Sequence, residues 1–227
     1  MKRSEINKFI TEAKKIFADH GFTLPPFAYW TPEEWRHKGA EADEIRDNTL
    51  GWDVTDFGQG DFLRWGLLLF TIRNGNSRRP DRYPKQYAEK IMIVKEGQMT
   101  PLHFHWKKRE DIINRAGGEL VFEAFKAAAD ESLSDERFTL SMDGIRREFG
   151  PGGRFSLAPG MSVTFEPYTY HLFYAAPGKG SVVVGEVSAV NDDQEDNRFY
   201  EPMGRFPVID EDTPPVHLLC REYPPPA

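Results

Sequence analysis

Seven short runs of β-branched, aromatic and leucine residues follow Gly51, and they restrict this chain to a small set of folds. The runs are FLRWGLLLFTIR, AEKIMIVKEG, GGELVFEAF, RFTLSMDGIRREF, RFSLAPGMSVTFEP, YHLFYAA and GSVVVGEVSAV. Turn sequences such as DG, PG and GKG punctuate them, and no helical pattern between them is long enough for a crossover between parallel strands. The pattern predicts a mainly β domain in which antiparallel strands form a sandwich or a barrel.

The segments on either side of these runs have different patterns. Apolar residues recur at three- and four-residue steps from Ile6 to Phe17, which predicts an amphipathic helix. TPEEW offers Thr31 as a cap, a proline at the first helical position and Glu34 three residues after the cap, which predicts a second short helix. The last residues, EDTPPVHLLCREYPPPA, favour an extended segment. We expect a helical extension at residues 1–50, a β-barrel at 51–205 and a proline-rich tail at 206–227 that packs on the same domain or on a partner subunit.

The composition limits the function classes. With 39% hydrophobic and 13% aromatic residues in 227, the chain has enough apolar side chains for one folded domain with extensions. Its 36 acidic and 29 basic residues give a net charge of −7, which argues against a nucleic-acid partner. The single cysteine, Cys220, excludes an internal disulfide, and the longest apolar run, Trp65 to Phe70, is too short for a membrane span. We expect a cytoplasmic protein.

Two of the six histidines lie one residue apart in PLHFHWKKRED. If LHFHW forms a strand, His103 and His105 point to the same face, and both rings can reach one metal ion. Glu110 from the next strand would add a carboxylate, and His171 is the remaining histidine in a strand-like pattern. Each residue alone is more often a hydrogen-bonded core histidine or a solvated charge. The occurrence of three histidines in the strand-rich region favours a metal site.

The expected ligand set indicates the kind of metal. Three histidines and a glutamate without a thiolate suit divalent Mn, Fe, Co, Ni or Zn. Four protein ligands on a six-coordinate ion leave two positions open, and a substrate with two adjacent oxygens would occupy them. This arrangement is typical of a Lewis-acid enzyme rather than of a structural zinc site.

The spacing of this segment is that of a known motif. Gly97, His103, His105, Glu110 and Gly117 match the first cupin motif, G-x5-H-x-H-x3,4-E-x6-G, at every position. On these residues the chain resembles the cupin superfamily. The resemblance implies a cupin-type antiparallel β-barrel, which is jelly-roll-like.

The second cupin motif, G-x5-P-x-G-x2-H-x3-N, is only partly kept. Gly153 and Pro159 match its start, whereas His171 follows twelve residues after Pro159. Pro167 is closer to the histidine, but Tyr-Thr-Tyr follows it with no glycine. His171 is therefore assigned as the third histidine ligand from its strand-like context and not from the motif.

The whole chain resembles the D-lyxose isomerases, which are sugar ketol-isomerases of the cupin superfamily. The shared features are the N-terminal helical extension, YAEK at Tyr87, PLHFHWKKREDIINRAGG, and EVSAVNDDQEDNRFYEP from Glu186. The resemblance implies a homodimer with bound manganese. It also implies conversion of D-lyxose to D-xylulose, with D-mannose to D-fructose as a related activity on a free sugar.

Such an isomerisation moves a proton between C1 and C2 through an enediol, and it needs a carboxylate base near these carbons. Glu186 is the candidate base, because a charge within SVVVGEVSAV requires either an exposed edge or an inward-facing polar pocket. Strand alternation places it on the face of Val182 and Val184. Glu110 would also serve as the base if its bond to the metal is loose.

Other polar residues are candidates for sugar binding. Lys90 precedes IMIV, where its ammonium group would either approach a sugar oxygen or extend to solvent at the strand end. The NDDQEDNR segment offers further hydrogen-bonding groups, although an acidic turn of this kind is usually solvated. Its candidates are Asp192, Asp193 and Arg198.

Two other function classes remain compatible with these residues. A cupin oxygenase would use Fe(II) and bind O2 and an organic substrate at the open positions. A non-catalytic cupin would bind a sugar beside a structural metal without turning it over. The only basic cluster beside the motif is KKR at Lys107, so a free sugar is preferred to a phosphosugar.

Overall fold

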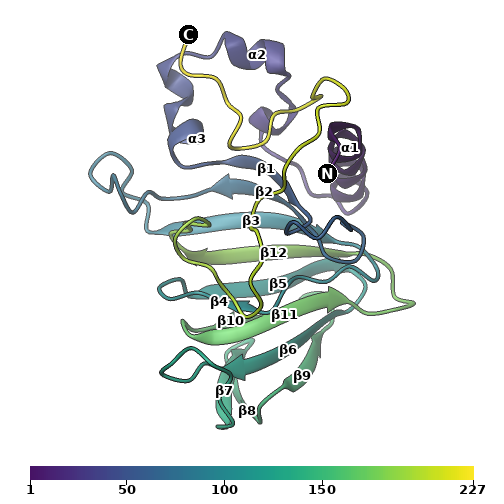
Figure 1. The fold of residues 1–227 in the computed structure, drawn as a ribbon, viewed down its shortest axis with the longest axis vertical. Coiled ribbons are helices and arrows are strands. Elements are labelled where there is room, and N and C mark those ends of the chain that lie inside the picture. Colours follow the sequence, from purple (N-terminus) through teal and green to yellow (C-terminus); the bar gives the residue numbers. More distant parts are fainter.

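The computed structural model describes residues 1–227 and places 13 strands in two antiparallel sheets (Figure 1). In spatial order the larger sheet contains β1 (Gly51–Thr55), β2 (Leu67–Arg73), β3 (Tyr87–Val94), β12 (Val182–Ala189), β5 (Glu110–Gly117), β10 (Ser162–Phe165), β7 (Phe138–Met142) and β8 (Ile145–Phe149). The smaller sheet contains β13 (Arg198–Phe199), β4 (His103–Phe104), β11 (Thr169–Ala175), β6 (Leu120–Lys126) and β9 (Gly153–Leu157). The expected mainly β, cupin-type fold class is confirmed. No strand ladder joins the two sheets, so they do not form one closed barrel.

The helices precede the first strand. They are α1 (Arg3–Asp19), η1 (Pro26–Tyr29), α2 (Pro32–Arg36), η2 (Ala40–Ala42) and α3 (Asp43–Asp47). The predicted cap of α2 is confirmed, since the Thr31 hydroxyl accepts a hydrogen bond from the Glu34 amide at 3.2 Å. No helix combines the length and the apolar composition needed to cross a bilayer.

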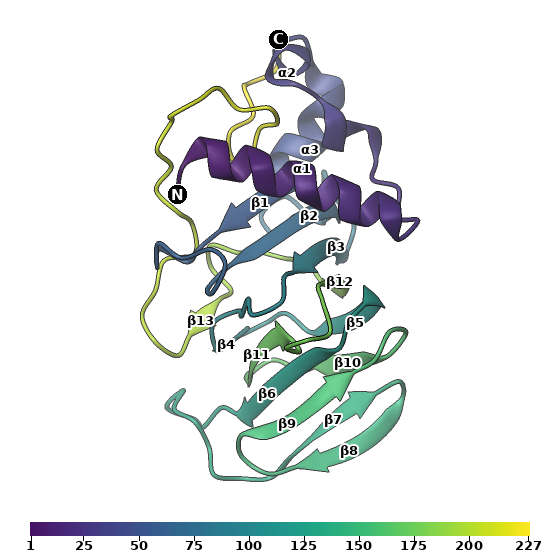
Figure 2. The same cartoon turned by 90° about the vertical axis from the view of Figure 1, so that its right-hand side faces the viewer.

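Alternation along β2 and β3 divides the core into two layers. Leu68 and Phe70 point outward and pack with Ile6 and Ile10 of α1, which lies across this end of the sheet in Figure 2. Leu69, between them, points inward to the layer between the two sheets. The outer face of this end of the larger sheet is therefore largely apolar. Its inner face is free to carry polar residues where the apolar layer ends.

The C-terminal segment lies against α1 and β1. Leu219 forms a bridge with Trp52 of β1, and Asp210 forms a bridge with Lys2. Arg3 is only 1% exposed, and its guanidinium group pairs with Glu211 and Glu222 of the tail. These contacts fix the course of the segment that follows β13, which passes beside the candidate site.

Candidate active site

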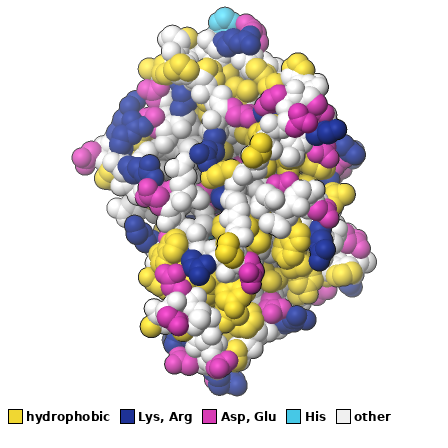
Figure 3. All heavy atoms as spheres, in the orientation of Figure 1, with side chains coloured by type: hydrophobic (Ala, Val, Ile, Leu, Met, Phe, Trp, Pro, Cys, Tyr) yellow, Lys and Arg dark blue, Asp and Glu magenta, His cyan; other side chains and the backbone are white.

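The four predicted metal ligands lie together between the sheets. One potential ligand atom from each of His103, His105, Glu110 and His171 lies within 4.8 Å of the others. His103 of β4 and His171 of β11 are register partners, and Glu110 begins β5 in the opposite sheet. No histidine is visible over the sheets on the face of the molecule in Figure 3, where acidic and basic side chains are interspersed. The cluster is thus an interior feature that both sheets build.

The backbone sets the orientation of all three rings. The Nδ1 atom of His103 lies 2.8 Å from the carbonyl oxygen of Pro101, and that of His171 lies 3.0 Å from that of Thr169. Nδ1 of His105 contacts the carbonyl oxygen of Asp196. A carbonyl only accepts hydrogen bonds, so each Nδ1 carries a proton, and Nε2 is the ring nitrogen that remains to bind a metal. This is the tautomer that a metal ligand requires.

The Nε2 atoms and the Glu110 carboxylate are suited to a cation between them. Oε1 of Glu110 is buried without a hydrogen-bond partner, and it lies 3.0 Å from His171 Nε2 and 3.4 Å from His105 Nε2. Burial, followed by the two neighbouring histidines, lowers the pKa of His103 well below its usual range, so its ring is neutral. Nε2 atoms of the histidines and this carboxylate oxygen thus converge within the cluster. The donor set therefore fits a divalent metal ion.

The backbone conformation explains why glycine stands at two positions of the motif. Gly97 has a φ angle of 78° and Gly117 one of 92°, both in the left-handed region that favours glycine. A Cβ atom on Gly117 would also lie 2.3 Å from the carbonyl oxygen of Ser181. Gly97 precedes the loop into β4, and Gly117 ends β5, so both residues fix strands that carry ligands.

Charged side chains continue from the ligands along the inner face of the larger sheet. Lys108 Nζ lies 2.7 Å from Glu110 Oε2 and 2.9 Å from Glu186 Oε1. Lys90 Nζ lies 3.3 Å from the same oxygen of Glu186. Glu186 and Lys90 are register partners on β12 and β3, and both are at most 5% exposed. Glu186 thus faces inward with Val182 and Val184, as strand alternation predicts.

The charged side chains that follow the ligands form a row along the sheet, and they shift one another's pKa values. Burial raises the pKa of Glu186, but the ammonium groups of Lys108 and Lys90 outweigh burial, and the resulting pKa is below the usual range. Burial lowers the pKa of Lys108, and the carboxylates of Glu110 and Glu186 outweigh it in the other direction. At neutral pH the carboxyl group of Glu186 is therefore ionised and able to accept a proton.

The last member of this row is Arg205, which has an N–H group without a hydrogen-bond partner. Asp193 Oδ1 lies 3.8 Å from Lys90 Nζ, and Asp193 Oδ2 lies 3.2 Å from Arg205 Nη2. Asn191 accepts a hydrogen bond from Lys90 at 2.7 Å. Nη1 of Arg205 is buried and has no hydrogen-bond partner. An unpaired buried donor beside a cavity is a binding group for a ligand oxygen.

One cavity of about 40 Å³ contacts both the ligand cluster and the charged row. Lys90, Lys108, Glu186, Asp193 and Arg205 line it together with the four ligands. Rings from Phe57 and Phe199, 5.8 Å apart between centroids, also line it. This volume holds only a few waters, so a larger ligand requires movement of these side chains.

Two residues predicted to bind sugar lie elsewhere. Asp192 lines a neighbouring cavity, and its carboxylate pairs with Arg78 at 3.4 Å. Arg198 pairs with Glu131 at 3.0 Å, and its side chain is 35% exposed. The structure does not bring Asp192 or Arg198 into the lining of the cavity beside the ligands.

Three residues of the site escaped sequence reasoning. The sequence KKR predicts that Lys108 lies in a turn. However, Lys108 is two residues before Glu110, so in an extended chain both side chains point to the same side. The carboxylate of Asp196 accepts the amides of Lys107 and Lys108, both at 2.9 Å, and fixes the turn after His105. Arg205 follows the strands in an irregular segment, and its sequence context gives no signal.

Comparison with known families agrees with this geometry. The sequence profile of the family described as D-lyxose isomerase matches residues 1–223. A D-lyxose/D-mannose isomerase from Escherichia coli O157:H7 is 47% identical over 224 residues, which cover 98% of both chains. A protein of the same name from Serratia proteamaculans is 48% identical over 225 residues, again 98% of both chains.

Solved structures of more distant proteins share the fold. The L-ribose isomerase of Cellulomonas parahominis with L-ribose superposes with a TM-score of 0.61 at 17% identity, over 92% of this chain and 98% of that one. The L-ribose isomerase of Acinetobacter sp. DL28 in complex with L-ribose gives 0.58 at 15% identity, over 88% and 93%. At these identities the likeness concerns the fold alone.

Proposed function

The chain belongs to the D-lyxose isomerase family and is a sugar aldose-ketose isomerase, and from this premise we propose that it converts D-lyxose to D-xylulose and D-mannose to D-fructose as free sugars. The observation that carries the proposal is the orphaned Glu110 Oε1 among three imidazole rings, beside the ionised carboxylate of Glu186. The first group suits a metal and the second suits a proton acceptor. Their shared cavity supports one reaction that uses both.

His103, His105, Glu110 and His171 would hold the divalent ion. Manganese is our proposal for its identity, with Co, Ni, Fe and Zn also compatible with this donor set. When bound, the ion supplies positive charge that acidifies the hydrogen beside the sugar carbonyl and stabilises charge on the sugar oxygens.

Glu186 would move the proton. Its carboxylate takes the C2 hydrogen of the open-chain aldose as a proton. The electrons of the C–H bond form the C1–C2 double bond, and the electrons of the C1 carbonyl bond pass to O1, which gives an enediolate. The same group returns the proton to C1 while the hydroxyl proton passes from O2 to O1, so C2 becomes the carbonyl carbon. Lys108 and Lys90 contact Glu186, and Lys90 would donate a hydrogen bond to a sugar oxygen.

The end of the charged row would bind the rest of the sugar. Nη1 of Arg205 donates to a hydroxyl oxygen. Asp193 orients Arg205, and Asn191 orients Lys90. The sugar displaces Phe57 or Phe199 on entry, because the cavity of about 40 Å³ is too small to hold it. We give Asp192 and Arg198 the structural role of fixing the segments around this site.

Three broader proposals rest on the family resemblance, for the dimer, and on the sequence patterns, for the location and the division of the chain. We propose a homodimer, a cytoplasmic location, and the division into residues 1–50, 51–205 and 206–227. The mixed surface charge in Figure 3 supports a small-molecule substrate rather than a nucleic acid.

One experiment separates this function from its two alternatives. The protein is stripped with a chelator, reloaded with Mn(II), and given D-lyxose, D-mannose or D-xylose under nitrogen while ketose is measured. Ketose that forms only with metal and without oxygen supports the isomerase. Turnover that requires iron and oxygen would instead identify an oxygenase, and saturable sugar binding without ketose would identify a binding protein. Mannose 6-phosphate beside mannose tests the preference for a free sugar.

A further inference from the structure

We propose that Asp53 is a positioning residue that holds Arg205 so that its free nitrogen faces the sugar. This inference rests on the proposed function. Asp53 is 6% exposed, and its Oδ2 atom lies 2.6 Å from Arg205 Nη2. Asp193 contacts the same nitrogen at 3.2 Å. Two carboxylates thus bind Nη2 of the guanidinium group, and the buried Nη1 has no partner.

The strand β1 holds Arg205 by its backbone as well. The Thr55 hydroxyl donates a hydrogen bond to the carbonyl oxygen of Arg205 at 2.8 Å. Trp52 and Val54 point to the outer core, so alternation places Asp53 and Thr55 together on the inner face. Arg205 lies in an irregular segment that forms no ladder, and these two contacts therefore tie it to a regular strand.

The contact with Asp53 determines where the free donor points. A guanidinium group is planar, so fixing Nη2 also fixes the direction of Nη1. A buried N–H without a partner destabilises the site, and a hydrogen bond to a sugar hydroxyl would remove this cost. Asp53 itself does not line the active cavity. Its effect on the sugar passes through Arg205.

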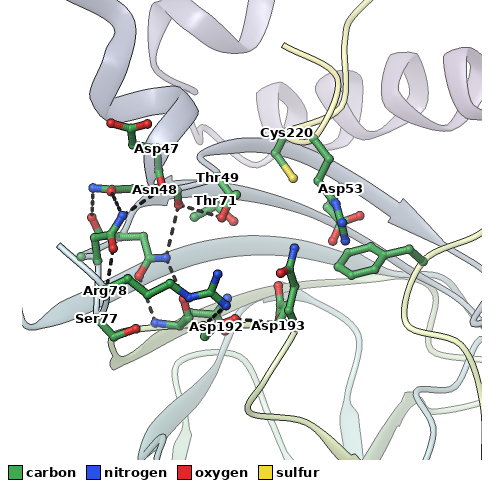
Figure 4. Close-up of a pocket in the computed structure, with 17 residues that line it drawn as sticks. Asp47, Asn48, Thr49, Asp53, Thr71, Ser77, Arg78, Asp192, Asp193 and Cys220 are labelled. Carbon is green, nitrogen blue, oxygen red and sulfur yellow. Dashed lines mark hydrogen bonds and ion pairs between the residues drawn. The ribbon is translucent and has the colours of Figure 1, made fainter. Parts of the chain in front are cut away.

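Asp53 lines a second cavity that makes the inference testable. This cavity has a volume of about 140 Å³, and only two of its 17 lining residues are hydrophobic. Figure 4 draws Asp53, Asp193 and Cys220 at its wall. The volume corresponds to several waters. A small carboxylate can therefore enter the cavity and reach the position that a truncated Asp53 would leave empty.

The test compares Asp53→Ala with the wild-type holoenzyme in the presence and absence of formate. We expect the KM for D-lyxose to rise by about 10- to 100-fold in Asp53→Ala, the range for a hydrogen bond to a charged group, with a change in kcat of less than about threefold. Formate should lower the KM of Asp53→Ala most of the way to the wild-type value by pairing with Arg205. A residue with a merely structural role would show no such rescue.

Two further variants complete the test. Asp53→Asn keeps the side-chain volume, so it should fold if the alanine variant does not, and its KM should rise without formate rescue. Asp47→Ala is the matched control, because Asp47 lines the same cavity but pairs with Arg79 and Tyr83. Its KM should stay at the wild-type value with or without formate.

The outcomes distinguish this inference from the proposed function. A wild-type protein that turns over no sugar overturns the proposed function. An active wild type with an unchanged KM in both Asp53 variants overturns the positioning role. A raised KM in Asp53→Ala that formate does not lower also overturns it, because the lost group would then not be a carboxylate that acts on Arg205.

Discussion

The two ends of the candidate site are held by different kinds of bond. At the ligand end, three imidazole rings are oriented by backbone carbonyls. At the other end, ammonium and guanidinium groups alternate with carboxylates and hold one another, through Lys108, Glu186, Lys90, Asp193 and Arg205. The ring orientations at the first end therefore depend on the backbone. The second depends on charge balance, so the loss of one member affects the others.

The largest effect should follow from the loss of a ligand. His103→Ala removes one of four donors, and kcat/KM should fall by about 10⁴-fold, since a Lewis-acid metal contributes several kcal/mol. Metal content, measured by mass spectrometry, should fall with activity. His37→Ala is the control, because the side chain of His37 is 74% exposed. Full metal content in inactive His103→Ala would contradict the assignment.

The base should be separable from the metal. Glu186→Gln keeps the size of the side chain but cannot accept the proton, so kcat should fall by about 10³-fold. The ligand end does not depend on this carboxylate, and metal content should stay at the wild-type level. If Glu186→Gln loses its metal, the two ends are not independent.

Lys108 joins the two ends, and its removal should destabilise the fold. Lys108→Met leaves the buried carboxylates of Glu110 and Glu186 without their shared cation, which should lower the free energy of unfolding of the metal-free protein by about 3–5 kcal/mol. Urea denaturation measures it. Lys107→Met is the adjacent exposed control. Equal stability of the two variants would contradict the role of Lys108 as the shared cation of Glu110 and Glu186.

A smaller change should loosen the ligand end alone. Asp196→Ala removes the acceptor of the Lys107 and Lys108 amides beside His105, and metal affinity should weaken by about 10- to 100-fold. Competition with a chelator of known affinity measures this change. Glu195→Ala is the control, since Glu195 is a largely exposed neighbour that pairs with exposed Arg78. Equal metal affinities of Asp196→Ala and Glu195→Ala would show that Asp196 does not support His105.

The smallest effect should come from Arg109, which lies between Lys108 and Glu110 in the sequence. Its side chain is 66% exposed and pairs with Glu166, which is 54% exposed. Arg109→Ala should change the free energy of unfolding by less than about 1 kcal/mol and leave kcat/KM unchanged. A large effect in thermal denaturation or turnover would mean that exposed charges also support the site.

The ligand end was the more predictable of the two. His103, His105 and Glu110 lie within one short segment, so their spacing alone predicts that they meet. Alternation along β12 also predicts the inward direction of Glu186. The packing of α1 follows from its apolar period in the same way.

The charged end depends on long-range packing. Arg205 reaches the site because the segment after β13 crosses β1, and no local pattern encodes that path. The sequence likewise shows five acidic residues near Asp196 without showing which of them faces the turn after His105. The two-sheet arrangement, rather than a closed barrel, depends on strand pairing that hydrophobic alternation does not specify.

The most direct test of the account is hydrogen exchange at C2 of the sugar. The Mn(II)-loaded wild type and Glu186→Gln are incubated with D-lyxose in D2O, and deuterium in the sugars is followed by NMR. The account predicts deuterium at C1 of the ketose with the wild type, and almost none with the metal-loaded Glu186→Gln protein. Wild-type exchange in Glu186→Gln would place the base elsewhere and would contradict proton transfer by Glu186.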